Sequence, residues 1–168
     1  PPMIASVLYA DDRLVAIAKP AGVSLATSRR DPRGAVERIV SRIPSSERVL
    51  HVLDPASLLL VHRLDVGTSG VVVLARDADS HRDLVSAFSR RMVTKTYLAL
   101  VWGRPRPSSG EWSASLGPDR RDRRRMRVIS DGRSALTAYR VVGRARHVSL
   151  LELEPKTGRT HQIRVHLA

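Results

Sequence analysis

The sequence predicts an α+β fold, a mixed and largely antiparallel sheet with a few packed helices. Two observations lead to this prediction: short β-like runs outnumber helical ones, and most of them are joined by short turns. The chain has 168 residues, enough for one well-buried core, and its composition shows no shift that would separate two domains. We therefore expect a single domain over residues 1–168.

The first expected elements are a hairpin and a helix. Residues 6–9 and 14–18 are β-like and are joined by a segment with two adjacent aspartates, which favours a tight turn. Over residues 34–43 apolar side chains recur at helical spacing, and Pro44 follows. This pattern predicts a helix that packs by one face and stops at the proline.

The remaining expected elements are a second helix and five strands. Asp79 or Ser80 is expected to cap the helix, and Arg90 and Arg91 suit its C-terminal end. Its buried stripe is expected to comprise Leu84, Val85, Phe88 and Met92. The β-like runs are 71–74, 96–102, 134–142, 147–154 and 160–167.

The charge of the chain favours a polyanionic partner. Its net charge is +13, and among 29 basic residues the lysines are Lys19, Lys95 and Lys156. Arginine contacts phosphate bidentately and stacks on bases. A GC-rich genome would explain arginine over lysine, but not the surplus over acids. An anionic membrane would also fit the charge, but no amphipathic basic helix or long apolar span is visible, so nucleic acid is the better interpretation.

Cysteine usage and the N-terminus bear on the compartment. The chain has no cysteine, which excludes disulfides, thiolate catalysis and cysteine metal sites and favours the cytoplasm. The N-terminus, Pro1-Pro2-Met3-Ile4, lacks the apolar core of a signal peptide. Its start on proline suggests a chain that has been trimmed or begins inside a longer one.

The stretch 62–70, His-Arg-Leu-Asp-Val-Gly-Thr-Ser-Gly, is the strongest candidate for a catalytic segment. It places one carboxylate, Asp65, among an arginine, a histidine and two hydroxyls, directly before an apolar strand. An acid at the edge of a core is costly unless it is paired or hydrogen-bonded, and such loops often hold catalytic groups. An alternative of similar weight is that Asp65 caps a turn and bonds the hydroxyls of Thr68 and Ser69.

HRLD followed two residues later by TSG resembles the catalytic motif of the RluA-type pseudouridine synthases. Residues 95–101 (KTYLALV) and 155–167 (PKTGRTHQIRVHL) resemble the second and third motifs of that family, and 12–22 and 132–139 resemble strands of its core. The resemblance implies a mixed α+β core with the active cleft across the sheet. It implies an isomerase that flips specific uridines out of structured RNA, ribosomal or transfer RNA, and converts them to pseudouridine. No cofactor, metal or membrane partner is implied, and we expect a monomer.

Three residues match catalytic positions of the family. Asp65 matches the catalytic aspartate, which would attack C1′ or remove a proton from the sugar. Arg164 matches its cationic partner, with a surface arginine on an alternating strand as the alternative. Tyr97 matches the tyrosine that stacks on the target uracil, with core packing as the alternative. His161 and His166 would face opposite sides of the expected strand, so a shared metal is not expected.

A further set of residues is expected to contact RNA. Arg63 matches the position that fills the space left by the flipped base, although an ion pair near Asp65 fits equally well. The run 119–127 follows Gly117-Pro118, carries six arginines in nine positions, and is expected to be an exposed loop that contacts phosphates without reading sequence. A phosphate-binding turn or a simple β-turn is expected over 157–160, and His62 could equally be structural. The expected RNA contacts are Arg63, His62, Thr68, Arg159, Arg123, Arg124 and Arg125.

Two other classes of protein fit the sequence less well. A non-catalytic RNA-binding protein would explain the charge but not the carboxylate motif, and the few aromatics give no stacking platform of the usual kind. A glycosidase or nucleoside hydrolase would use paired carboxylates.

The chain departs from the family at 23–27, which lacks the usual histidine and proline, and no S4-type domain precedes the core. Family members continue beyond the third motif, so a natural end at Ala168 and a missing C-terminal segment both fit.

Overall fold

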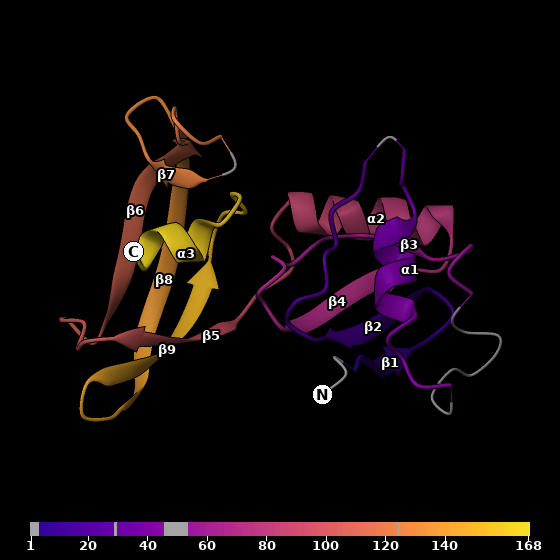
Figure 1. The fold of residues 1–168 in the computed structure, drawn as a ribbon, viewed down its shortest axis with the longest axis horizontal. Coiled ribbons are helices and arrows are strands. Elements are labelled where there is room, and N and C mark those ends of the chain that lie inside the picture. Colours follow the sequence, from indigo (N-terminus) through magenta and orange to yellow (C-terminus); the bar gives the residue numbers. More distant parts are fainter. Residues whose placement is uncertain (1–3, 29, 46–53, 124) are drawn as a thin grey trace. The chain divides into compact units, whose positions relative to one another are not determined.

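The computed structural model describes residues 4–28, 30–45, 54–123 and 125–168 (Figure 1). The chain divides into two compact units, Pro1–Met92 and Val93–Ala168, called the first and second units below. The sequence predicts one core, whereas the buried apolar residues form one cluster in each unit. The α+β class is confirmed, and the paired strands, all antiparallel, belong to two sheets instead of one. That residues 1–168 act as a single catalytic domain stays a prediction.

The first unit holds a four-stranded sheet with the strand order β1-β2-β4-β3. Its strands are β1 (Ser6–Ala10), β2 (Leu14–Lys19), β3 (Leu59–Leu60) and β4 (Gly70–Ala75), and its helices are α1 (Gly34–Val40) and α2 (Ala78–Ser89). The expected hairpin is confirmed. The Asp11 carboxylate closes its turn by accepting from the backbone N–H groups of Arg13 and Leu14, both at 2.8 Å.

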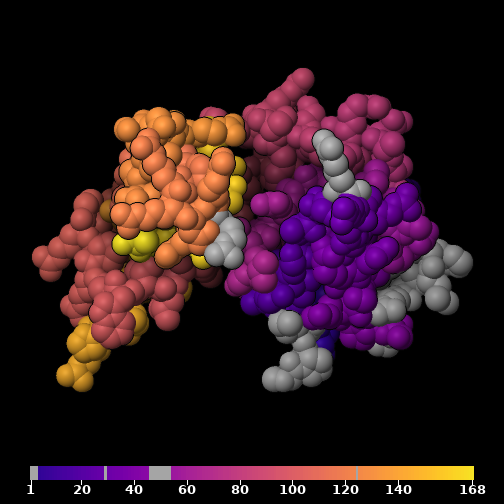
Figure 2. All heavy atoms as spheres, turned by 45° about the horizontal axis from the view of Figure 1, so that its top comes forward, coloured from indigo at the N-terminus to yellow at the C-terminus, as the bar shows by residue number. Residues whose placement is uncertain are grey.

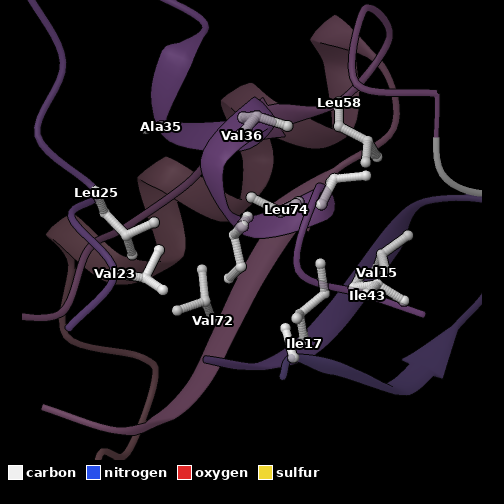
Figure 3. Close-up of a cluster of buried hydrophobic side chains, with 13 residues drawn as sticks. Val15, Ile17, Val23, Leu25, Ala35, Val36, Ile43, Leu58, Val72 and Leu74 are labelled. Atoms are coloured by element: carbon white, nitrogen blue, oxygen red, sulfur yellow. The ribbon is translucent and has the colours of Figure 1, made fainter. Parts of the chain in front are cut away.

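The core of the first unit follows from alternation along its strands. Val15 and Ile17 of β2 and Val72 and Leu74 of β4 are buried on one face of the sheet, as period-two patterning requires. Val36 of α1 packs into the same cluster, which Figure 3 shows in close-up. The predicted helix over 34–43 is therefore confirmed, although its regular part ends at Val40.

The sequence-based description of α2 was wrong in two respects. Its N-cap is Asp77, whose carboxylate accepts from the Ser80 N–H at 2.8 Å, and not Asp79 or Ser80. Its expected stripe is not uniformly core, because Val85 is exposed and Met92 is 74% exposed. Met92 lies beyond the end of the helix, and Val85 flanks the stripe formed by the half-buried Leu84 and Phe88.

The second unit is a five-stranded sheet with the order β5-β9-β8-β6-β7. Its elements are β5 (Tyr97–Trp102), β6 (Ser109–Pro118), β7 (Met126–Val128), β8 (Arg133–Arg144), β9 (Val148–Pro155) and α3 (Gln162–His166). The predicted strands over 96–102, 134–142 and 147–154 are confirmed as β5, β8 and β9. The strands β6 and β7, which flank the arginine run, were not expected from the sequence.

The predicted strand over 160–167 was wrong, because this segment forms the short helix α3. His161 has left-handed backbone angles (φ 53°) and turns the chain into the helix. The alternation of Ile163, Val165 and Leu167 suggested a strand, but Ile163 and Leu167 are also four residues apart and so share one face of a helix. Both pack against the core of the second unit, and the Leu167 N–H donates to the Ile163 carbonyl at 3.0 Å.

Candidate active site

The catalytic candidate Asp65 lies in the loop that joins β3 to β4 in the first unit. It is half-buried, and its carbonyl accepts from the Thr68 N–H at 3.0 Å, which closes a turn over 65–68. Gly70, where the loop enters β4, has φ 139°, a conformation that favours glycine. The side chains of Thr68 and Ser69 form no hydrogen bond within the described part of the chain, so the turn is held by the backbone and not by Asp65 bonding these hydroxyls.

A buried lysine holds this loop in place from the adjacent strand end. Lys19, the last residue of β2, is only 1% exposed. Its Nζ donates to the carbonyls of Pro20 at 2.9 Å, Val23 at 3.0 Å and Val66 at 3.3 Å. Val66 directly follows Asp65, and its carbonyl also accepts from the Gly22 N–H at 2.6 Å. One ammonium group thus ties the turn after β2 to the loop that carries the candidate carboxylate.

Lys19 and Asp65 also interact electrostatically. Burial lowers the pKa of Lys19, and the Asp65 carboxylate opposes this shift by stabilising the ammonium form. The structure therefore places a fixed cation near Asp65 within the first unit. Sequence reasoning treated Lys19 only as the end of a strand. The composition held a signal for this role, because lysine is rare in a chain that otherwise uses arginine. An ammonium group is compact and can fit among converging carbonyls.

The two residues before the Asp65 loop differ in their surroundings. His62 Nε2 accepts from the Val73 N–H at 3.0 Å, and its ring stacks on Phe88 with centroids 4.5 Å apart. These contacts favour the structural interpretation of His62, and its contact with RNA stays a prediction. Arg63 is exposed and forms no hydrogen bond or ion pair with any described residue, so the expected alternative of an ion pair with Asp65 is not seen.

Tyr97 and Arg164, the other two catalytic candidates, belong to the second unit. Tyr97 opens β5 opposite Leu153 and is partly buried against the core of this unit. Arg164 lies exposed on α3 and lines a depression of about 460 Å³, together with His161, Arg125 and Arg127. This depression gathers three arginines at one place, which suits a phosphate or another anion.

A buried glutamine organises the third motif. Gln162 is 4% exposed, and its Nε2 donates to the carbonyl of Leu136 and to the hydroxyl of Thr137, both at 2.9 Å. Its Oε1 accepts from the Thr157 hydroxyl at 2.7 Å and from the Arg159 N–H at 3.0 Å. The turn over 157–160 is therefore built on Gln162, a residue that sequence reasoning missed. This role was not predicted because Gln162 falls within the segment 160–167, which was expected to be a strand.

Arg159 is anchored on this turn. Its Nε donates to the carbonyl of Ser134 at 2.9 Å, which fixes the direction of the guanidinium group. The anchored side chain retains further N–H donors that no hydrogen bond to a described residue uses. Its contact with RNA stays a prediction.

His166 is a half-buried histidine, and its Nε2 atom is buried with no hydrogen-bond partner in the described ranges. Its Nδ1 bonds the Thr137 hydroxyl at 2.9 Å, and burial lowers its pKa. The unfolded chain therefore binds a proton more readily than the folded one. We expect the free energy of unfolding to be highest above the ordinary histidine pKa of 6.5 and to fall as the pH is lowered below it.

Urea unfolding monitored between about pH 5 and pH 8 checks this expectation. The variant His166→Gln keeps an acceptor for the Thr137 hydroxyl but cannot titrate. It should show a flatter dependence of stability on pH than the unaltered protein. Equal slopes for the two proteins would show that His166 does not contribute.

The arginine run forms the tip of the β6–β7 hairpin, as expected for an exposed loop, and Figure 2 shows this orange region at the surface of the second unit. The Asp119 carboxylate accepts from the N–H groups of Arg121 at 2.7 Å and Asp122 at 3.3 Å. These bonds and the nearby Arg127 lower the pKa of Asp119. Arg120 pairs with Asp131 at 3.9 Å and Arg127 with Asp119 at 3.4 Å.

Three arginines of the run have no acidic partner among the described residues, and all three are exposed. They are Arg121, Arg123 and Arg125. Arg124, also expected to contact RNA, lies outside the described residues. The tip thus presents unneutralised guanidinium groups around a turn that Asp119 stabilises.

Membrane-spanning helices and clusters of metal ligands are both absent from the described residues. No helix among them is both long and apolar enough to cross a bilayer. They also contain no group of three or more histidine, aspartate or glutamate side chains placed to hold a metal ion.

Comparison with known proteins identifies the family. The sequence model for RNA pseudouridylate synthase matches residues 13–168. A protein of Chloroflexus aurantiacus named as an uncharacterized RNA pseudouridine synthase is 45% identical over 150 residues, which cover 89% of this chain and 46% of that protein. Ribosomal large subunit pseudouridine synthase D of Xanthomonas campestris pv. campestris is 42% identical over 164 residues, which cover 97% of this chain and 47% of that protein.

A solved structure supports the same family. Human RNA pseudouridylate synthase domain containing 4 superposes with a TM-score of 0.75 at 30% identity, covering 96% of this chain and 63% of that one. The chain therefore belongs to the RNA pseudouridylate synthase family, which confirms the resemblance found in its motifs. It spans about half the length of the curated relatives it matches.

Proposed function

We propose that this chain is the catalytic core of an RNA pseudouridine synthase of the RluA type, acting in the cytoplasm on uridines of structured RNA. The observation that supports this most strongly is the placement of Asp65. It is a half-buried carboxylate on a turn that a buried cation, Lys19, ties to the neighbouring strand end. Its HRLD motif resembles the catalytic motif of the family, and the chain belongs to that family.

The reaction is an isomerisation, and its atoms balance without another reactant. The C1′–N1 bond breaks, the uracil turns over, and a C1′–C5 bond forms, while the hydrogen leaves C5 and a proton is taken up at N1. The site must supply a carboxylate close to the sugar and keep the detached base from leaving. In our proposal Asp65 either attacks C1′ or removes a proton from the sugar.

The other candidates act on the target nucleotide and its neighbours. We assign Tyr97 to stacking on the uracil and Arg164 to pairing with the catalytic carboxylate. Arg63 has no partner in the described part of the first unit, so its side chain is available to fill the space that the flipped uridine leaves in the stack. The basic depression beside α3 would hold an adjacent phosphate.

Ribosomal RNA is the first substrate to test, because the Xanthomonas campestris relative is named ribosomal large subunit pseudouridine synthase D. RNA with tritium at C5 of uridine gives a direct assay, since forming the C1′–C5 bond expels the C5 hydrogen. We expect tritium release from ribosomal or transfer RNA, matched by pseudouridine found on mapping the product. Binding of RNA without release from either RNA would instead support a non-catalytic RNA-binding protein.

The unpaired arginines of the hairpin tip should contribute affinity without chemistry. Replacing Arg121, Arg123 and Arg125 with glutamine should weaken binding to all RNA sequences and flatten its dependence on salt. Each lost phosphate contact should change the logarithmic salt slope by roughly 0.7 to 0.9. Single-turnover tritium release at saturating RNA should change little, because these residues are assigned to the RNA backbone.

A control with the same change in charge replaces Arg13, Arg82 and Arg140 with glutamine. Each of these arginines pairs with an acid on the protein surface, so their loss should affect the salt slope less. Equal slopes for the two triple variants would place the RNA path elsewhere on the surface.

A further inference from the structure

An exposed tryptophan marks one end of the sheet in the second unit. Trp102, the last residue of β5, is 81% exposed. Its ring stacks on His147 in the β8–β9 turn, with centroids 5.6 Å apart and an interplanar angle of 16°. The backbone fixes the two segments together, because the Gly103 N–H donates to the His147 carbonyl at 2.7 Å. The Trp102 ring is therefore held in a defined place while most of its surface remains in contact with solvent.

Unneutralised arginines lie on the two segments that meet at Trp102. Arg104 and Arg106 follow β5, Arg144 is the last residue of β8, and Arg146 lies in the β8–β9 turn. Figure 1 shows the end of β5 and this turn at the same end of the sheet. All four are exposed, and none forms a side-chain hydrogen bond or ion pair with a described residue. Residues 102–110 and 141–151 contain no acid.

A comparison on the same sheet shows that this lack of partners is local. Farther along β8, Arg140 pairs with Glu152 at 2.8 Å. The charge of Arg140 is therefore neutralised within the protein, whereas the charge of the four arginines near Trp102 is not. An external polyanion is the partner that would complement them.

We propose that this surface, defined by Trp102, His147, Arg104, Arg106, Arg144 and Arg146, binds an unpaired segment of RNA. One base stacks on the free face of Trp102, and the flanking phosphates lie against the arginines. Base stacking on an aromatic ring combined with contacts of basic residues to the backbone is the usual way in which proteins hold single-stranded nucleic acid. The site uses none of the residues assigned to chemistry, and it rests on the proposed function because it takes the substrate of that function.

The exposed face of β5 continues from Trp102 with Leu100 and Leu98, so a protein or membrane partner is the competing possibility. The substitution Trp102→Leu separates the two. Leucine keeps the surface apolar, as a protein or membrane contact requires, but it removes the aromatic ring on which a base can stack. We expect Trp102→Leu to weaken binding of single-stranded RNA roughly tenfold and Trp102→Phe to restore most of it.

Fluorescence gives a direct measure. The chain has two tryptophans, and the other, Trp112, stacks on Tyr139 inside the second unit with centroids 3.9 Å apart. In a Trp112→Phe background, a single-stranded oligouridine should therefore quench the emission of Trp102, and an RNA duplex should quench it less. Quenching by anionic lipid vesicles or polyglutamate without any response to oligouridine would overturn the proposal, as would unchanged RNA affinity in Trp102→Leu.

The charge is tested by a matched pair of variants. Arg144→Gln combined with Arg146→Gln should lower the affinity for oligouridine more than Arg140→Gln, whose arginine is already paired. Equal losses would argue against the proposal. Thermal melting of each variant confirms that the exposed substitutions leave the fold intact.

The measurements use binding and not turnover, so they can be made on the full chain carrying Asp65→Asn. If tritium release fails while Trp102 is quenched by oligouridine, the proposed function is wrong and this surface stands. The opposite result is also informative. If tritium is released, but RNA does not quench the fluorescence of Trp102 and Trp102→Leu binds RNA with unchanged affinity, only this inference is wrong.

Discussion

Replacing Asp65 with asparagine is expected to abolish tritium release from C5-labelled RNA, lowering single-turnover rates by at least about 100-fold. The amide has almost the same shape as the carboxylate, but it can neither attack C1′ nor accept a proton from the sugar. Because the turn at Asp65 is closed through its backbone carbonyl, the substitution should leave the fold unchanged. RNA affinity should also change little, since the basic residues that supply it are retained.

Asp12→Asn is the matched control. Asp12 is an exposed acid at the β1–β2 turn of the same unit, so this variant makes the same chemical change outside the candidate site. Its activity should equal that of the unaltered protein. If Asp65→Asn retained activity within about tenfold of the unaltered protein, Asp65 would have no direct part in the bond-breaking step.

Local patterns predicted the first unit well. The β-like runs expected at 14–18 and 71–74 are the strands β2 and β4, and each of them buries one face. The helix at Gly34–Val40 followed from its spacing and from the proline after it. Asp65 could be singled out because a carboxylate at the edge of a core requires an explanation, and the family motif supplied one.

The failures have a common physical cause. The segment after Pro155 alternates like a strand, but the buried Gln162 side chain bonds four polar groups, two in the turn over 157–160 and two on β8, and these bonds hold the segment as a turn and a short helix. These partners lie between three and 26 residues away along the chain, so local pattern does not reveal them. The same holds for Lys19, whose carbonyl partner at Val66 is 47 residues distant.

The division into two units also could not be predicted from the amino-acid composition. Both units use the same apolar residue types, so no change in sequence marks the boundary near Met92. The units are distinguished by which strands pair, and pairing depends on long-range contacts. The residues matched to catalysis are divided accordingly, with Asp65 in the first unit and Tyr97 and Arg164 in the second.

Lys19 should be the most sensitive position outside the carboxylate itself. Lys19→Met keeps a side chain of similar length but leaves the carbonyls of Pro20 and Val23 without this donor, and Val66 with only its bond from Gly22. Buried acceptors that lose their donor cost about 1 to 3 kcal/mol each, so the free energy of unfolding of the first unit should fall by about 2 kcal/mol or more. Urea unfolding followed by circular dichroism measures this loss.

Lys19 should act on catalysis as a positioning residue, through the loop that carries Asp65 and through its charge. At temperatures where Lys19→Met is still folded, we expect kcat to fall at least about tenfold while KM changes little. Lys19→Arg keeps the charge and should retain more of kcat than Lys19→Met, even where its larger head group lowers stability. A variant Lys19→Met that is destabilised but shows an unchanged kcat would reduce Lys19 to a purely structural residue.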